Sequence, residues 1–511
     1  MFRRSRRSAG SAGPRPVASL VRSAAAVTVE PLEGRRLFSS SVVGDVFYIA
    51  LENHNFTQPA SDTSAPQQLL GNPAAPFLNS LVTPGNPNAA QTAYASAYHN
   101  VLATPSGNSP SIHPSEPNYI WEEAGSNLGT TGDADPYTAG VNNVFAGPNL
   151  SGLLQSAGIS WKSYQEDIDL TPTGGTVNFP TANSLTSTVA PQNQWTVPTK
   201  SLSGTSSAYT NPYNGSNQYN FAVKHDGQLF FTDTNGGTLT AANTSNSNPE
   251  TLFYAPLQQL STDLTNNTVA RYNWITPDQF NDMHSSLNTN FTYKGVTYTH
   301  NTDQESVALG DNFLSMIVPQ IMASQAYKNN GVIVIWNDET EGNANDFAHT
   351  STEIVISPLA KGNAYNSTVN FTHSSDVKTL QEIFGVPAPG GGFLGDANTP
   401  GTNDLSDLFV PGVFTPSSLG GTVYKNSGND GKVEAGLTIV LTGVNDAGQQ
   451  VSLTTTTDDD GSYSFDGLLP GTYDVSVQGT KKDVGISKIT LGVGQTLNSQ
   501  DFSLLGPDSH R

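Results

Sequence analysis

The sequence contains no cysteine among its 511 residues. Disulfides, thiolate zinc sites and cysteine nucleophiles are therefore excluded. Basic residues are also scarce, 22 against 43 acidic ones, and the formal net charge is −21. Such an acidic surface disfavours nonspecific binding to nucleic acid or to anionic membranes. It would also repel an anionic substrate unless a local cation offsets the field, and this favours a metal site.

The sequence also lacks an apolar run near the roughly 20 residues that a membrane-spanning helix needs, so no integral membrane segment is expected. Positive charge gathers at the start, where residues 1–40 hold eight arginines and two glutamates, a net charge of +6. The rest of the chain therefore carries −27. The stretch VEPLEGRRLFS at 29–39 resembles the "LEPR-LLS" segment near the start of many exported planctomycete proteins. We expect residues 1–41 to be a basic leader of a bacterial protein that is secreted or placed at the cell surface. The alternative is a disordered basic segment that has no part in export.

At this length the chain is expected to form one large domain plus smaller pieces. Between residues 42 and 386, helical patterns end at a glycine and an apolar strand follows. Leu150–Ala157 is one such pattern, ended by Gly158 and followed by a strand at 159–164. This order is typical of an α/β doubly wound fold with a mainly parallel sheet.

Two apolar runs, at 46–51 and 332–336, each end in metal-seeking side chains. Continuous runs of this kind suit strands that are buried on both faces of a parallel sheet. Ligands bind at the carboxyl ends of such strands, where three carboxylates and an amide would repel one another without a cation. Taken singly, these residues could equally be solvated loop residues. Taken together, they predict one or more divalent metal ions, of unspecified identity, bound by Glu52, Asn53, Asp338 and Glu339.

Ser115 is a candidate nucleophile because it stands between two prolines in HPSEPNY at 113–119. The prolines predict an extended and exposed backbone at this serine. Histidines at 284 and 373 offer groups for proton transfer. Alone, Ser115 would more readily be a turn residue, and His284 a surface histidine.

Seven short motifs resemble, in order, the phosphoesterase family of bacterial and fungal acid phosphatases and phosphatidylcholine-type phospholipases C, within the alkaline phosphatase superfamily. They are ENHNF at 52–56, HPSEPNY at 113–119, GISWKSYQE at 158–166, KHD at 224–226, ITPDQFNDMH at 275–284, DE at 338–339 and THS at 372–374. The resemblance implies an alkaline-phosphatase-like fold in which the four predicted ligands hold the metal and Ser115 attacks phosphorus. It also implies that His284 and His373 are active-site histidines and that the Asn118 amide donates to phosphate oxygens.

The implied reaction is hydrolysis of a phosphate ester through a phosphoseryl intermediate. The metal would lower the pKa of the Ser115 hydroxyl, and His284 would protonate the leaving alcohol. Phospholipases C of this group tend to show Thr-X-Pro-Asn-Arg, whereas SEPNY at 115–119 is similar to the acid phosphatase branch. We therefore predict an acid phosphatase acting on phosphomonoesters. The alternatives are a phospholipase C acting on phospholipid head groups and an inactive surface adhesion protein.

Residues 387–417 contain three consecutive glycines and are predicted to be a linker. Short alternating strands at 418–511 then predict a small all-β sandwich. The stretch GSYSFDGLLPGTYDV at 461–475 resembles the B-type repeats of Gram-positive surface adhesins, which implies a spacer or attachment to a cell surface or matrix. Those repeats often bind Ca²⁺, although Lys425 and Asn426 lie where acidic residues are preferred. The candidate Ca²⁺ ligands are Asn429, Asp430 and Glu434.

Overall fold

The computed structural model describes residues 42–100, 112–181, 183–341, 347–425, 432–479 and 484–504. The predicted leader at 1–41 lies outside the described residues, as do Asn429 and Asp430 of the predicted Ca²⁺ site. Within the described ranges, no helix is both long enough and apolar enough to span a bilayer.

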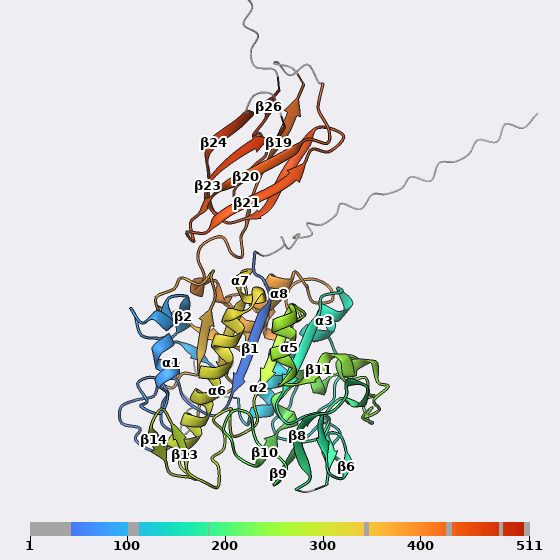
Figure 1. Ribbon diagram of the computed structural model, residues 1–511, viewed down its shortest axis with the longest axis vertical. Coiled ribbons are helices and arrows are strands. Elements are labelled where there is room, and N and C mark those ends of the chain that lie inside the picture. The colour runs from blue at the N-terminus through green and yellow to red at the C-terminus, as the bar shows by residue number, and fades with distance from the viewer. Residues whose placement is uncertain are drawn as a thin grey trace, which may run out of the picture. The chain divides into compact units, whose positions relative to one another are not determined.

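An eight-stranded sheet forms the centre of the larger domain, and Figure 1 labels its strands β1, β2 and β11. The strand order is β11-β4-β12-β1-β15-β16-β2-β17. Its strands are β1 (Val46–Leu51), β2 (Thr92–Ala95), β4 (Trp161–Gln165), β11 (Tyr254–Pro256), β12 (Tyr272–Thr276), β15 (Val332–Asn337), β16 (Glu353–Ile356) and β17 (Tyr365–Ser367). Neighbouring strands are parallel except for β16, which is antiparallel to both β15 and β2. The predicted mainly parallel sheet is confirmed.

Helices cover both faces of this sheet. The described helices are α1 (Pro76–Leu81), α2 (Ser115–Ala124), α3 (Leu150–Ser156), α4 (Thr232–Asn235), α5 (Gln259–Asn266), α6 (Asp303–Ala323), α7 (Gln325–Lys328) and α8 (His373–Phe384). Side chains of α2, α3 and α8 share one hydrophobic core with one face of the sheet, and those of α1, α5 and α6 share the other core with the opposite face. The doubly wound arrangement is therefore confirmed.

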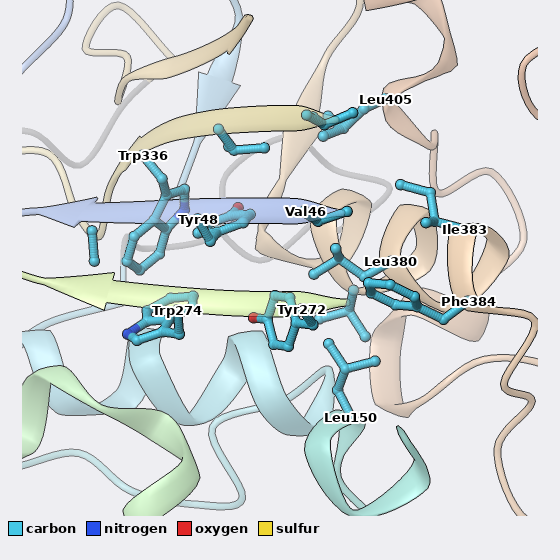
Figure 2. Close-up of a cluster of buried hydrophobic side chains, with 14 of the residues drawn as sticks. Val46, Tyr48, Leu150, Tyr272, Trp274, Trp336, Leu380, Ile383, Phe384 and Leu405 are labelled. Atoms are coloured by element: carbon cyan, nitrogen blue, oxygen red, sulfur yellow. The ribbon is translucent and has the colours of Figure 1, made fainter. Parts of the chain in front are cut away.

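The strand β1 shows why the residues at 46–51 are all apolar. Val46 and Tyr48 point into the core with α8, where Figure 2 shows Val46 near Leu380 and Tyr48 near Trp336. The residue between them, Phe47, points into the other core. Successive side chains of a strand alternate between faces, so a strand covered on both sides is apolar throughout.

The described part of the larger domain also contains ten short strands outside its main sheet. They are β3 (Tyr98–His99), β5 (Leu170–Pro172), β6 (Gly175–Thr176), β7 (Phe179–Pro180), β8 (Leu185–Val189), β9 (Leu202–Thr205), β10 (Gln218–Phe221), β13 (Phe291–Tyr293), β14 (Val296–Tyr298) and β18 (Phe371–Thr372). They form two-stranded ladders outside the main sheet. Six of them occupy the polar stretch at 170–221, which sequence periodicity did not resolve into strands.

The stretch at 387–417 differs from the linker that its glycines and prolines predicted. Two short 3-10 helices, at Gly395–Asn398 and Leu405–Leu408, contact α8. Leu408 and Phe409 are buried in the core that α8 shares with the sheet. Its scattered apolar residues are thus core residues, and this part of the chain packs as an extension of the larger domain.

The C-terminal region is all-β, as predicted. Its strands are β19 (Ser417–Tyr424), β20 (Thr438–Asn445), β21 (Gln450–Thr456), β22 (Ser462–Leu468), β23 (Gly471–Val477), β24 (Val484–Leu491), β25 (Thr496–Leu497) and β26 (Phe502–Ser503). They form two sheets around a core of their own. Along β23, buried Tyr473 and Val475 alternate with exposed residues. Glu434, a predicted Ca²⁺ ligand, lies 2.9 Å from the ammonium group of Lys425.

Candidate active site

The carboxyl ends of β1 and β15 bring the predicted metal ligands together. The two strands are parallel neighbours with Leu51 opposite Asn337, so the residues that follow meet at one edge of the sheet. The backbone amide of Asn53 donates to Oδ1 of Asp338 at 3.3 Å. Glu52 and Asp338 are fully buried and Glu339 is nearly so.

The backbone at Asn53 explains why an asparagine suits this position. Its φ is +49°, a left-handed conformation that asparagine tolerates better than most residues. Its Oδ1 is buried and has no hydrogen-bond partner among the described residues. The amide oxygen is therefore available as a ligand.

Ser115 lies at the first position of α2, where it is 2% exposed. The sequence prediction of an extended, exposed serine was wrong. Pro117 fits within the first helical turn because the first amide groups of a helix have no intrahelical acceptor. The Ser115 hydroxyl donates to Oε2 of Glu52 at 2.9 Å and lies 3.4 Å from Oε1 of Glu339. The candidate nucleophile thus lies directly against two of the predicted ligands.

Two residues that sequence reasoning did not place in the site hold Glu52. The Tyr119 hydroxyl donates to Oε1 of Glu52, and Nε2 of His225 lies 3.2 Å from the same oxygen. The two rings stack with centroids 5.1 Å apart. The helical spacing from Ser115 to Tyr119 was the available signal, but the expected extended backbone concealed it.

Asp282 is a further carboxylate of the site that the prediction omitted. It follows β12, and its backbone carbonyl accepts from the amide of Glu52 at 2.8 Å. Its Oδ2 lies 3.3 Å from Nδ1 of His225. Burial, followed by the charges of Asp338 and Asp282, raises the pKa of Glu52 well above its usual range. The crowding of acids that suggested a cation is therefore greater than the sequence indicated.

The donors present fit a hard divalent cation. Carboxylate and amide oxygens are the ligands that such ions prefer. In the described part of the chain, Oδ1 of Asn53 and the Oδ2 atoms of Asp282 and Asp338 have no hydrogen-bond partner. Buried polar atoms without partners are rare in native proteins unless an ion or water satisfies them.

The two predicted histidines take different places. His373 is buried, with Nε2 2.9 Å from Oδ1 of Asn118 and Nδ1 2.7 Å from the Tyr98 hydroxyl. Burial lowers the pKa of His373 to about 3, so its ring is neutral. The Asn118 amide nitrogen lies 3.5 Å from Oε2 of Glu339. His373 therefore positions Asn118.

His284, by contrast, is exposed, and its ring centroid lies 6.1 Å from that of His225. Its backbone amide donates to Oδ1 of Asp282 at 2.8 Å. Among the described contacts none joins His284 to Ser115. The structure thus places His284 beside the acid cluster but does not bring it onto the nucleophile.

A lysine stands beside these acids. Lys224 forms an ion pair with Asp133, and Oδ1 of Asp133 accepts from the amide of Glu116, the residue after Ser115, at 3.0 Å. Although burial opposes it, Asp133, Glu52 and Asp338 together raise the pKa of Lys224. The site therefore includes a fixed positive charge near the nucleophile.

Comparison with known proteins agrees with this geometry. The family model described as Phosphoesterase family matches residues 107–387. The chain belongs to the phosphoesterase family. A second model, for carboxypeptidase regulatory-like domains, matches residues 418–505. Family membership makes the chain a hydrolase that acts on phosphoester bonds.

Individual relatives are distant. The chain is 25% identical over 322 residues to phosphatidylinositol-3-phosphatase of Mycobacterium tuberculosis, a match that covers 63% of this chain and 74% of that protein. Among solved structures, it is similar to the lipoteichoic acid synthase LtaP from Listeria monocytogenes, at 10% identity and a TM-score of 0.35, over 74% of this chain and 77% of that one. It is also similar to a protein in the alkaline phosphatase superfamily from Vibrio parahaemolyticus, at 10% identity and a TM-score of 0.35, over 89% and 84% of the two chains.

Proposed function

We propose that this phosphoesterase is a metal-dependent phosphatase of the acid phosphatase type that cleaves phosphomonoesters with Ser115 as its nucleophile. The observation that carries the proposal is the 2.9 Å hydrogen bond from the Ser115 hydroxyl to Glu52, inside a cluster of buried carboxylates. The position of Ser115 at the start of a ten-residue helix adds support, because helix N-termini favour bound phosphate.

The proposed reaction gives each of these side chains a role. A bound divalent cation would neutralise phosphoryl charge and lower the pKa of the serine hydroxyl. Ser115 Oγ releases its proton to Glu52 and bonds to phosphorus while the bond to the leaving oxygen breaks. His284 gives a proton to the leaving alcohol. Water then gives a proton to His284 and bonds to phosphorus while the bond from phosphorus to Ser115 Oγ breaks. Glu52 returns its proton to Ser115, which restores the hydroxyl as phosphate leaves.

One residue and one relative support the proposed substrate class. Phospholipases C of this group tend to carry arginine after Pro-Asn, whereas Tyr119 here is buried and bonded to Glu52. The relative in Mycobacterium tuberculosis is named for hydrolysis of a phosphoinositide phosphomonoester. Both support a phosphomonoester, including a phosphomonoester on a lipid head group, over the phosphodiester that a phospholipase C cleaves.

The test is hydrolysis of a chromogenic phosphomonoester by wild type and by Ser115→Ala, each with and without chelator. We expect the variant to lose at least about 10³-fold in kcat and the chelated wild type to lose activity that added metal restores. Ser80→Ala, in α1, is the matched control and should behave as wild type. Turnover that survives both Ser115→Ala and chelation would contradict the mechanism, and faster cleavage of phosphatidylcholine would favour the phospholipase alternative.

We also propose that the enzyme is exported and that its C-terminal domain attaches it to a cell surface or matrix. The basic leader and the likeness of 461–475 to adhesin repeats support this. Fractionation of the producing cells tests it, and enzyme found only in the cytoplasm would contradict it.

A further inference from the structure

A second group of acids lies buried away from Ser115, between the sheet and the helices α2 and α8. Glu122 comes from α2, Glu353 from β16 and Asp376 from α8. Each is at most 1% exposed. We refer to these three residues as the inner acid cluster. None of them belongs to the motifs that suggested the active site.

Two of the three acids lie close to His373, and Glu353 faces them from the sheet. Glu353 is paired with Trp336 across the β15–β16 ladder, so both side chains project from the same face. The Trp336 ring lies 5.2 Å from that of His373. One ligand atom each from Glu122, His373 and Asp376 lie within 4.8 Å of one another. That is about twice the 2.3–2.6 Å that separates Ca²⁺ from its oxygen ligands, so a single ion can reach all three. Nδ1 of His373 lies 3.5 Å from Oε1 of Glu122 but only 2.7 Å from the Tyr98 hydroxyl. The imidazole therefore already has a partner, and the remaining donors are oxygens.

Most of these oxygens lack a partner. In the described part of the chain, both carboxylate oxygens of Glu122 and of Glu353, and Oδ1 of Asp376, make no hydrogen bond. The Tyr48 hydroxyl is a further buried group without a partner, and it comes from a different element, β1. The tyrosine ring stacks on Trp274 with centroids 5.0 Å apart, and Figure 2 shows it beside Trp336.

Tyr48 lies on the same face of the sheet as the acids, because its ring centroid is 6.0 Å from that of Trp336, whose ring is 5.2 Å from that of His373. Burial and then the charges of Asp376, Glu122 and Glu353 raise the pKa of its hydroxyl. A positive side chain does not balance them. Among the described ion pairs, the cluster takes part only in that between Glu122 and His373, whose ring is neutral. Burying several unpaired polar or charged groups is costly, and proteins usually avoid it with a partner or a metal.

We propose that the inner acid cluster binds a hard divalent cation, Ca²⁺ or Mg²⁺, through Glu122, Glu353 and Asp376, with the Tyr48 hydroxyl as a further oxygen donor. The ion supplies the missing positive charge and satisfies the unpartnered oxygens together. An oxygen-only donor set selects these ions over softer metals. This site is separate from the one beside Ser115 and does not depend on the proposed reaction.

The inner site is joined to the active site through His373 and α2. His373 contacts Asn118, which reaches Glu339 beside Ser115. Along α2, the spacing from Ser115 to Asn118 and Glu122 places all three on one side of the helix. A cation bound at Glu122 therefore fixes the helix that carries the nucleophile.

The test measures metal content and thermal unfolding of the full-length chain after chelation and dialysis. Adding Ca²⁺ or Mg²⁺ to wild type should raise the melting temperature by about 5 °C or more. The double variant Glu122→Gln/Glu353→Gln should bind one equivalent fewer and lose the part of this shift that comes from the inner site. Glu123→Gln is the matched control, because Glu123 is equally buried on the same helix but accepts two hydrogen bonds from Ser151.

Two further variants separate the sites. Asp338→Asn should lose an equivalent of metal at the active site yet keep the melting shift of the inner site. Tyr48→Phe, which should fold even if the double variant does not, is expected to need about tenfold more Ca²⁺ for half of the shift. The proposal is overturned if the double variant retains wild-type metal content and shift, or if Tyr48→Phe responds to both ions as wild type does.

Discussion

Glu52 shows how single side chains prepare this site before substrate arrives. One carboxylate oxygen accepts from Ser115 and the other from Tyr119, with His225 next to it. A carboxylate held at both oxygens has little freedom to turn. The ring of Tyr119 stacks on His225, so the residues that hold Glu52 also hold one another. Such supporting contacts orient metal ligands, and their loss typically weakens metal affinity by about 10- to 100-fold.

The first residue-scale prediction concerns Tyr119→Phe. Removing the hydroxyl frees one oxygen of Glu52 while the ring remains stacked, so metal affinity at the active site should fall by about 10- to 100-fold. The measurement is the metal concentration that restores half-maximal phosphatase activity to the chelated enzyme. Tyr254→Phe, which removes a buried hydroxyl bonded to the carbonyl of Thr234, is the control. Equal metal requirements in both variants would show that Tyr119 has no such role.

The second concerns Lys224, a fixed cation in an otherwise acidic site. Lys224→Gln should raise the KM for a phosphomonoester and the inhibition constant of inorganic phosphate by about tenfold, because one attraction for a dianion is lost. The control is Lys328→Gln. Lys328 is exposed on α7, the helix that precedes β15, so this substitution removes the same charge at the opposite edge of the sheet. If the two variants have the same phosphate inhibition constant, Lys224 does not face the phosphate.

At the scale of elements, α2 marks where local sequence rules failed. Two prolines around Ser115 predicted an extended segment, yet Pro114 stands at the position just before the helix and Pro117 occupies its first turn. Both positions tolerate proline because no intrahelical hydrogen bond is lost there. Tertiary packing then determines that the helix forms, and every residue of α2 is buried. Short-range preferences alone could not show this.

The polar stretch around β5 and β8 gives a prediction about pH. Asp169 is buried there, accepts from Asn178 and Thr196, and burial raises its pKa to about 8. The folded state therefore keeps a proton that the unfolded chain releases from about pH 4 upward. Stability from this group is full below pH 4 and is lost as pH rises toward 8, by at most about 1.4 kcal/mol per pH unit.

Asp169→Asn should remove that slope, because an amide stays neutral at every pH and asparagine accepts the residue's φ of +51°. The measurement is the free energy of unfolding between pH 5 and 8. Exposed Asp459→Asn provides the control and should keep the wild-type slope. An unchanged slope in Asp169→Asn would mean that this carboxyl is ionised in the folded protein.

At the scale of the whole molecule, the sequence predicted what depends on local pattern. The runs at 46–51 and 332–336 were identifiable as buried strands, and the rule for strand ends then placed Glu52 and Asp338 together. Contacts between segments that are distant in the sequence could not be predicted in this way, because they leave no local sequence pattern. The place of Glu353 beside helix α8 depends on how β16 pairs with β15, which puts this residue opposite Trp336. The apolar residues at 393–413 were likewise hidden among glycines and prolines.

The separate core of the C-terminal domain leads to the last prediction. The described site residues all precede residue 385, and the domain has its own buried cluster. A chain ending at residue 416 should therefore keep kcat/KM on a soluble phosphomonoester within about twofold of the full chain. The assay is run on protein whose folding has been checked by thermal unfolding. Loss of activity in a folded truncated chain would give the C-terminal domain a part in catalysis.

The helix α2 also limits how this protein can change through evolution. Ser115, Asn118, Tyr119 and Glu122 are each tied to different partners, yet all four sit on a helix of only ten residues. An insertion of one residue between Asn118 and Glu122 would turn everything after it by about 100° around the helix axis. An insertion inside α2 would therefore break several of these contacts at once, whereas a substitution changes the contacts of one residue at a time.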